Sequence, residues 1–259
     1  MILLVMLSTL ININEESNYL ASLRAGAWMP RLAGTILDGG SPIDLEANIS
    51  IHDAETVPLI EFNLSPTNSV SVSCSVFDFE TRGNGTYSGN DNYGGVSFVT
   101  GDSWSSKVAM QSVGFNTSLS MIEPYRTSND ATLTFAPVIG VRWFGIESEL
   151  QNKNTNDVTA HRNSFIALQG GCNMKFRLHD AEDFLGADEI TLQSELLLGS
   201  LFGGDGGAMW GIMAGIEAQV SNILGIYFGY RLQELDVEDG EYAFDAGLQG
   251  LYFGAQVQF

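Results

Sequence analysis

The sequence predicts an all-β protein that forms a closed antiparallel up-and-down β-barrel of about ten strands, with eight to twelve strands allowed. Apolar and polar residues alternate with a period of two along many segments, and the links between these segments are alternately short and long. The chain has 29 Gly and 6 Pro, and it has no apolar run long enough for a membrane-spanning helix. We expect a single barrel domain over residues 17–259.

Each expected strand is a segment in which one face is apolar and the other is polar or small. The clearest is SVSVSCSV at 69–76, where Val70, Val72, Cys74 and Val76 share one face and the four serines share the other. Ten segments show this alternation, and each is expected to form one strand. They lie at residues 20–32, 57–65, 68–79, 107–121, 132–147, 163–178, 189–202, 207–220, 223–236 and 243–259.

The links support a barrel whose two ends differ. Outer-membrane barrels have short turns at one end and long loops at the other. Counted from the first strand, the even-numbered links lie near 65–68, 123–130, 179–189 and 221–222, and the long polar odd-numbered links are 33–56, 80–106 and 148–162. The trend has two exceptions, because the 179–189 link is long and GGDG at 204–207 is short.

Pro137 lies inside the fifth segment. A proline has no N–H to give to a strand ladder, so it is unfavourable inside a sheet. We therefore expect either a bulge at Pro137 or a strand that begins after it.

Alternation alone fits a soluble barrel with its apolar faces inside as well as a membrane barrel with its apolar faces outside. The last strand, LYFGAQVQF at 251–259, favours the second arrangement. Its Tyr252, Phe253 and Val257 and the final Phe259 resemble the C-terminal insertion signal of bacterial outer-membrane β-barrel proteins. The resemblance is close over this strand and extends to the rest of the chain only as a pattern. It implies an outer-membrane location and contacts with the lipid bilayer, a lipopolysaccharide-like outer leaflet and the barrel-insertion machinery.

Aromatic residues on the outward faces are expected to form two girdles where the membrane meets water. One group lies near the expected extracellular ends of the strands, and the other lies near the periplasmic ends. The first group is Trp143, Phe202, Trp210 and Tyr230, and the second is Phe176 and Phe259.

Charged residues on the inward faces predict a paired and hydrated network in the lumen, because a desolvated charge needs a partner or water. The expected members are Arg24, Glu61, Arg142, Lys175, Arg177, Glu195, Glu217 and Arg231. Such a network could line a narrow passage for small anions, or it could fill the lumen with charges that only satisfy one another. The filled lumen is favoured, because about eight strands leave an interior just filled by side chains and open porin channels need 16 or more.

The first residues, including the apolar run ILLVMLSTLI at 2–11, resemble a secretory signal. Residues 1–16 are therefore interpreted as a signal peptide or its remnant. The alternative is an N-terminal strand or a core helix.

Charge and cysteine usage exclude several classes of protein. The formal net charge of −20 opposes binding to nucleic acid. Cys74 and Cys172 form no metal-binding or disulfide-rich motif, and no cofactor is expected. Asp236, Glu238 and Asp239 are weak candidates for binding divalent cations, but a solvated acidic loop is favoured and no dedicated metal site is expected.

No catalytic motif is present, and we do not expect an enzyme. His52 with Asp53, and His161 with Asp157, match outer-membrane proteases in residue type only. We expect a monomeric outer-membrane barrel with a structural or narrow, porin-like small-solute role. The alternatives are a secreted soluble barrel that binds an apolar ligand and, less favoured, an outer-membrane protease.

Overall fold

The computed structural model describes residues 21–67, 69–119, 125–126, 131–179 and 187–259. The predicted signal segment, residues 1–16, lies outside the described residues. Within the described part of the chain, no helix is long and apolar enough to cross a membrane.

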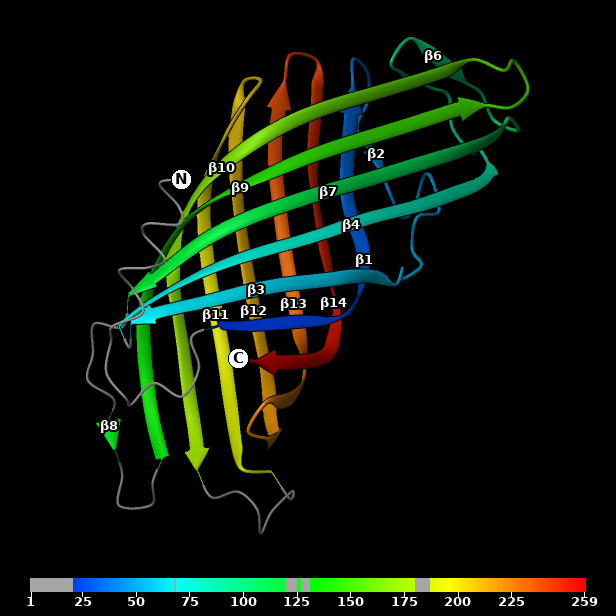
Figure 1. The fold of residues 1–259 in the computed structure, drawn as a ribbon. Helices are drawn as coiled ribbons and strands as arrows, with labels where there is room; N and C mark the ends of the chain where they lie inside the picture. The colour runs from blue at the N-terminus through cyan, green and yellow to red at the C-terminus, as the bar shows by residue number, and fades with distance from the viewer. Residues whose placement is uncertain (1–20, 68, 120–124, 127–130, 180–186) are drawn as a thin grey trace, which may run out of the picture.

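The described residues form strands joined by turns and loops (Figure 1). The strands are β1 (Ala21–Asp38), β2 (Ile43–Asp44), β3 (Val57–Thr67), β4 (Val70–Thr86), β5 (Asp91–Tyr93), β6 (Val96–Phe98), β7 (Ser103–Leu119), β8 (Tyr125–Arg126), β9 (Ala131–Asn152), β10 (Val158–His179), β11 (Glu189–Phe202), β12 (Gly206–Ser221), β13 (Leu224–Asp239) and β14 (Tyr242–Gln258).

The ten long strands close into one antiparallel barrel, which confirms the predicted fold class. From β9 through β14 each strand pairs with the next, β14 pairs with β1, and the order β1–β3–β4–β7–β9 completes the ring. The closing ladder runs from Ser22↔Gln258 to Asp38↔Tyr242. Phe259 and Ala21 extend it by exchanging two backbone hydrogen bonds of 2.9 Å. Closure satisfies the strand edges along most of the wall.

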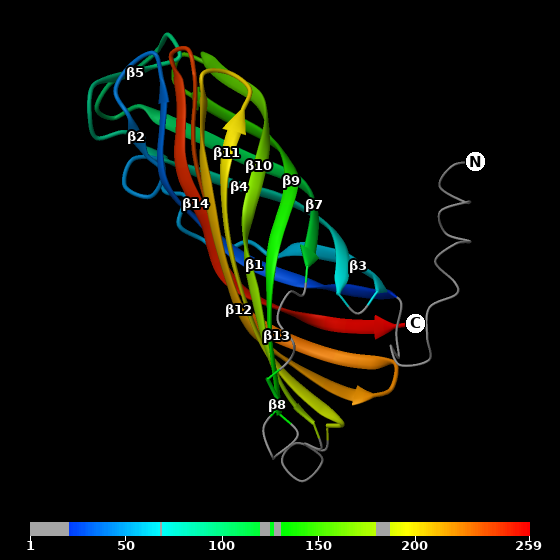
Figure 2. The ribbon, with the colours of Figure 1, turned by 90° about the vertical axis from the view of Figure 1, so that its left-hand side faces the viewer.

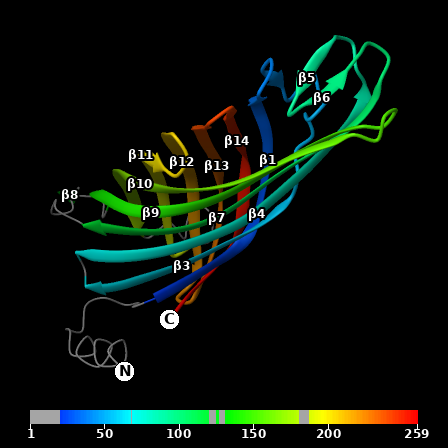
Figure 3. The same cartoon turned by 90° about the horizontal axis from the view of Figure 1, so that it is seen from above.

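Both described chain ends lie at one end of the barrel, here called the terminal end, and the opposite end is called the loop end (Figure 2). Seen from two directions, β3, β4, β7, β9 and β10 cross in front of β11–β14 (Figures 1 and 3). The front strands extend far toward the loop end, where β5 and β6 form a separate small hairpin.

An exposed apolar belt surrounds the barrel in its terminal half. Ile139 and Leu168 are each 64% exposed, and Phe228 is 54% exposed, although all three are large hydrocarbon side chains. The belt also includes Leu23, Met29, Ile60, Phe62, Val72, Val76, Phe115, Leu133, Phe135, Val141, Ile166, Met174, Leu192, Leu196, Leu198, Ile212, Ile216, Val220, Ile226, Leu251 and Phe253. An apolar surface of this extent is suited to lipid and not to water, which excludes the soluble barrel with inward apolar faces.

The polarity of the two faces is exchanged where the strands leave the belt, and β4 shows this clearly. Val72 and Val76 are exposed on its outward face, as a lipid-facing strand requires. Directly afterwards Phe77 and Phe79 are buried inside, while Asp78 and Glu80 occupy the outward face. The barrel therefore continues beyond the belt with a charged exterior and an apolar interior, as a water-soluble barrel would.

The apolar interior forms a plug above the level of the belt. It is defined here by Trp28, Leu32, Phe77, Phe79, Phe144, Phe165, Phe244 and Leu248, each at most 2% exposed. Trp28 meets Phe77 edge to face, with ring centroids 5.2 Å apart and planes at 81°. This geometry is favourable for aromatic pairs, and the strands that contribute the plug lie all around the ring.

The loop between β1 and β3 completes the wall beside the plug. β3 pairs with β1 only from Ala21 to Trp28, so the rest of β1 has no long neighbour on that side. β2 pairs with β1 there, and an isolated bridge joins Arg31 to Ala54. Four loop side chains are buried in the core, namely Ile43, Leu45, Ile49 and Ile51. The loop therefore acts as a wall segment packed by its own apolar residues.

Two sequence-based expectations about strand limits are wrong. Residues 148–162, expected as a long loop, mostly form the ends of β9 and β10, which pair from Val158↔Gln151 onward. Pro137 causes neither a bulge nor a later start, because β9 is in regular register with β10 at Pro137↔Cys172. On its other side β9 pairs with β7, and that ladder extends only to Ser118↔Val138. Pro137 therefore lies just past the end of the ladder with β7, where its missing N–H leaves no ladder hydrogen bond unmade.

Replacing Phe228 with arginine should impair membrane insertion. A charge placed against hydrocarbon near the bilayer midplane costs about 2–4 kcal/mol. Asp236→Arg is the matched control, because Asp236 is on the same strand and the same face but beyond the belt. The fraction of protein that folds into lipid vesicles, measured by heat-modifiable migration in gels, should be reduced for Phe228→Arg and not for Asp236→Arg. Equal folding of the two variants would contradict the assigned belt.

Candidate functional site

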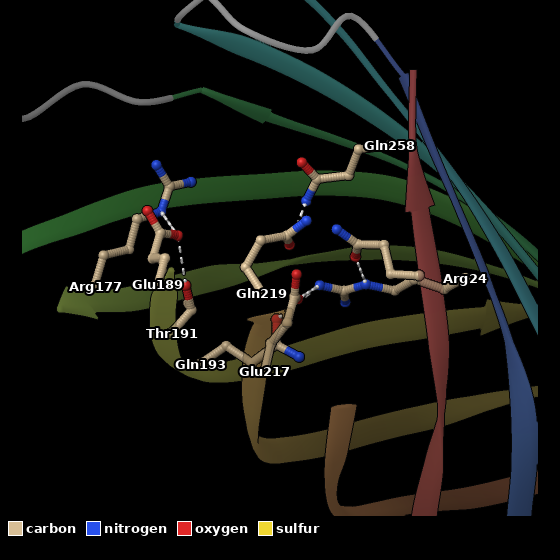
Figure 4. Close-up of polar contacts among 9 residues, drawn as sticks. Arg24, Arg177, Glu189, Thr191, Gln193, Glu217, Gln219 and Gln258 are labelled. Carbon is tan, nitrogen blue, oxygen red and sulfur yellow. Dashed lines mark hydrogen bonds and ion pairs between the residues drawn. The ribbon is translucent and has the colours of Figure 1, made fainter. Parts of the chain in front are cut away.

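Two polar regions could carry function: the lumen on the terminal side of the plug and a pocket at the loop end. The lumen region contains an ion pair between Arg24 and Glu217, whose side chains are 11% and 10% exposed (Figure 4). Arg24 also donates hydrogen bonds to the side-chain oxygens of Gln256 and, at 3.4 Å, Gln193. Its guanidinium lies 5.6 Å from the centre of the Tyr227 ring. This buried cation is therefore held by groups from four strands.

Arg142 and Arg231 are held by neutral groups. Arg142 donates to the hydroxyls of Ser112 at 3.1 Å and Ser75 at 3.0 Å. The Arg231 guanidinium lies 5.1 Å from the Trp28 ring centre and 5.7 Å from that of Phe77, and it donates to Gln233 at 3.1 Å. Both arginines thus lie against the floor of the plug, where hydroxyls, an amide and aromatic faces stabilise them.

The predicted lumen residues do not form a continuous chain of ion pairs. Among the described residues, Glu61, Lys175 and Glu195 have no oppositely charged atom within 4.0 Å. Arg177 is 3.8 Å from Glu189 near the terminal end, and Glu189 accepts a 3.1 Å hydrogen bond from Thr191 (Figure 4). Glu189 and the glutamines that surround Arg24 were not predicted from the sequence as lumen residues. Their positions on the inward faces of the alternating segments could have indicated this role.

The expected girdle residues lie on the outer surface. Trp143, Phe202, Trp210 and Tyr230 are 36–57% exposed. Trp143 is paired across the ladder with Ile166, which is paired with Phe202, so these residues share one level. Phe259 is 62% exposed at the terminal end, and Phe176 is partly buried. In the last strand, Phe253 and Val257 face outward, whereas Tyr252 is buried inside.

The loop end carries a pocket of about 660 Å³. Its lining comes from the loop-end parts of β1 and β10, from the β5–β6 hairpin and from the turn between β13 and β14 with the strand residues that flank it. The lining residues are Asp38, Gly39, Asn92, Gly94, Gly95, His161, Asp239, Glu241 and Tyr242. Gly94 and Gly95 have φ angles of 54° and 80°, which glycine adopts without the strain of a side chain.

A histidine and a buried carboxylate meet in this pocket. His161 Nε2 lies 2.9 Å from Asp38 Oδ1, and the Thr159 hydroxyl donates to Asp38 Oδ2 at 3.2 Å. The imidazole stacks on the Tyr242 ring at 5.0 Å with an interplanar angle of 15°. Burial raises the pKa of Tyr242 to about 12, so its hydroxyl stays protonated at neutral pH. The imidazole is therefore fixed on two sides while its side chain remains 35% exposed.

The other candidate residues are not assembled into sites. His161 contacts Asp38 and not Asp157, and His52 and Asp53 are both exposed in the wall loop. Asp236, Glu238 and Asp239 are exposed near the loop end, and no cluster of three potential metal ligands occurs among the described residues. Sequence spacing could not reveal the Asp38–His161 contact, because the two residues come from β1 and β10, which are not neighbours and lie across the ring from each other.

Replacing Glu217 with glutamine should destabilise the barrel by about 3–5 kcal/mol, because it leaves the buried Arg24 without its carboxylate. Glu189→Gln is the control, since its ion-pair partner Arg177 is 44% exposed and such pairs contribute about 0–1 kcal/mol. Urea unfolding in lipid vesicles should separate the two variants. Equal losses of unfolding free energy in the two variants would mean that burial of the Arg24–Glu217 pair does not determine how much the pair contributes to stability.

No family model matches the sequence, and no curated protein matches it. Solved structures do match its fold. The outer membrane protease OmpT from Escherichia coli aligns with a TM-score of 0.52 and 7% identity over 96% of this chain and 99% of its own. The attachment invasion locus protein Ail of Yersinia pestis aligns with a TM-score of 0.37 and 8% identity, over 92% of this chain and 98% of its own.

The toluene transporter TodX of Pseudomonas putida aligns with a TM-score of 0.33 and 8% identity, over 97% of this chain and 93% of its own. At such low identities the likeness concerns the fold alone. The closed ladder and the exposed apolar belt agree with it independently. The alignment with OmpT, together with the closed ladder and the belt, shows that the chain has the fold of the bacterial outer-membrane β-barrel proteins.

Proposed function

We propose that this protein is a structural outer-membrane barrel that does not conduct solutes and whose working surface is its loop end. In this proposal the loop end faces the outside of the cell, and the belt anchors it. The observation that carries the proposal is the plug of aromatic and aliphatic side chains across the lumen.

A solute passing along the barrel would have to displace this plug. Trp28, Phe79, Phe144, Phe244 and Leu248 are all 0% exposed, so no layer of water reaches them. Packed apolar side chains resist displacement, because opening a space among them loses both burial and contacts. A barrel of about ten strands is also close to the size at which side chains fill the interior.

The lumen charges support a structural role as well. A selective passage would expose its cations to the passing anion, whereas Arg24 is bound to Glu217 and two glutamines. Arg142 and Arg231 are likewise engaged by hydroxyl and aromatic groups at the plug floor. These three arginines are engaged by neighbouring side chains and thereby join strands across the barrel.

The purified protein should give no resolvable conductance steps in a planar lipid bilayer. A porin of 16 strands, reconstituted in the same bilayers, provides the positive control. Insertion is checked by heat-modifiable migration of the recovered protein. Resolved steps with selectivity for small anions would overturn the proposal and favour a narrow porin-like passage.

A second candidate function is hydrolysis at the loop end, and the pair formed by His161 and Asp38 is the observation that favours it. A carboxylate that orients an imidazole in an open pocket is an arrangement suited to general acid–base catalysis. If this role is correct, the protein should cleave a fluorogenic peptide library and His161→Ala should lower the rate at least 100-fold. His52→Ala should leave the rate unchanged. Absence of cleavage by the wild-type protein would remove this candidate.

A further inference from the structure

The barrel wall has an unpaired strand edge at the loop end. β10 pairs with β9 from Val158 onward, but its pairing with β11 begins only at Ile166↔Phe202. Among the described residues, no backbone hydrogen bond joins the stretch 158–165 to any strand other than β9. The edge lies beyond the belt, on the part of β10 that extends toward the loop end (Figure 1).

The register identifies which backbone groups are available. Asn152 N donates to Asp157 O, so the hydrogen-bonded pairs of the β9–β10 ladder are Asn152 with Asp157 and every second pair after it. The N–H and C=O groups of Val158, Ala160 and Arg162 therefore point away from β9, toward the open side. These groups have the two-residue spacing that a further strand requires.

The loop-end pocket lies beside this edge. His161, between Ala160 and Arg162, forms part of its lining, and the β13–β14 turn with Asp239, Glu241 and Tyr242 forms another part. A strand added to β10 would thus have the edge as its backbone partner, and its alternate side chains would enter or approach the pocket.

The charge of the pocket selects the partner. Asp239 and Glu241 have no cationic group within 4.0 Å among the described residues, whereas Asp38 is already paired with His161. The pocket therefore has a surplus of negative charge next to free backbone donors and acceptors. Lysine and arginine side chains would supply the missing positive charge.

We propose that the edge of β10 binds an extended basic polypeptide segment by strand addition. The segment's backbone forms hydrogen bonds with Val158, Ala160 and Arg162, and a basic side chain reaches Asp239 and Glu241 in the pocket. Strand addition supplies affinity through the main chain and specificity through alternate side chains. It also accounts for an edge of β10 that the described part of the barrel leaves without backbone hydrogen bonds. The proposal goes beyond the structural role and does not depend on whether the lumen conducts.

The test measures binding of labelled peptides to the full-length protein in lipid nanodiscs by fluorescence anisotropy. The probe is an eight-residue peptide in which lysine alternates with threonine and valine. A peptide with glutamate in place of lysine tests the charge requirement. A third peptide keeps the lysines but is N-methylated at alternate amides, so that it has the same charge and cannot complete the ladder.

The lysine peptide should bind at least ten times more tightly than either control peptide. Because the whole protein is strongly acidic, any lysine-rich peptide is attracted to it by charge. The N-methylated peptide has the same charge but cannot complete the ladder, so it measures this unspecific attraction alone. Equal binding of the N-methylated and unmethylated lysine peptides would overturn the proposal, as would equal binding of the glutamate peptide.

Variants of the protein provide the reciprocal test. Ala160→Pro removes an edge-facing N–H and leaves the hydrogen bonds to β9 in place, whereas Ala160→Ser keeps the N–H and is the matched control. Ala160→Pro should weaken binding of the lysine peptide at least tenfold, and Ala160→Ser should not. The double variant Asp239→Asn with Glu241→Gln should also weaken it. Correct folding is verified by heat-modifiable migration, and unchanged binding by a folded Ala160→Pro variant would refute the proposed edge.

Discussion

The strands of this barrel continue from the lipid-facing belt into the water-facing part without interrupting their hydrogen-bonded ladders, and the rest of the structure depends on that constraint. Side chains alternate with a period of two on both sides of the boundary, so the strand cannot rotate its apolar face inward. The sequence instead exchanges the polarity of the two faces. On β4 the exchange occurs between Val76 and Phe77, and on β9 it occurs between the exposed Trp143 and the buried Phe144.

This exchange divides the interior into two environments. Within the belt, the outward faces hold the apolar residues and the inward faces hold polar ones, so the lumen there needs partners for its charges. Beyond the belt, apolar residues fill the inside and form the plug, while Asp78, Glu80 and Glu147 lie outside. Arg231 lies where the two environments meet, with its guanidinium on the faces of Trp28 and Phe77. Sealing the lumen and extending the loop end are thus consequences of one arrangement.

Period-two alternation was sufficient to predict the ten long strands, because it depends only on local backbone geometry. It left open which face is outward, and the resemblance of the last strand to an insertion signal favoured the membrane barrel. Alternation failed at residues 148–162, where charged outward residues such as Glu149 gave the strand ends the composition of a loop. Two consecutive apolar residues, such as Trp143 and Phe144, mark the point where the polarity of the two faces is exchanged and could have indicated that the strand continues. The pocket could not be predicted, because Asp38 and His161 meet only through barrel closure and the crossing of β10 over the rear strands.

The exchange of faces on β4 is tested most directly by spin labels placed one at a time at Val72, Val76, Phe77, Asp78, Phe79 and Glu80, with Cys74 and Cys172 replaced by serine. Accessibility to oxygen, which concentrates in lipid, and to a water-soluble nickel chelate would be measured in bilayers. Labels at Val72 and Val76 should respond mainly to oxygen, those at Asp78 and Glu80 mainly to the chelate, and those at Phe77 and Phe79 weakly to both. Strong response of the Phe79 label to the chelate would contradict the account, because the lumen beyond the belt would then be open to water.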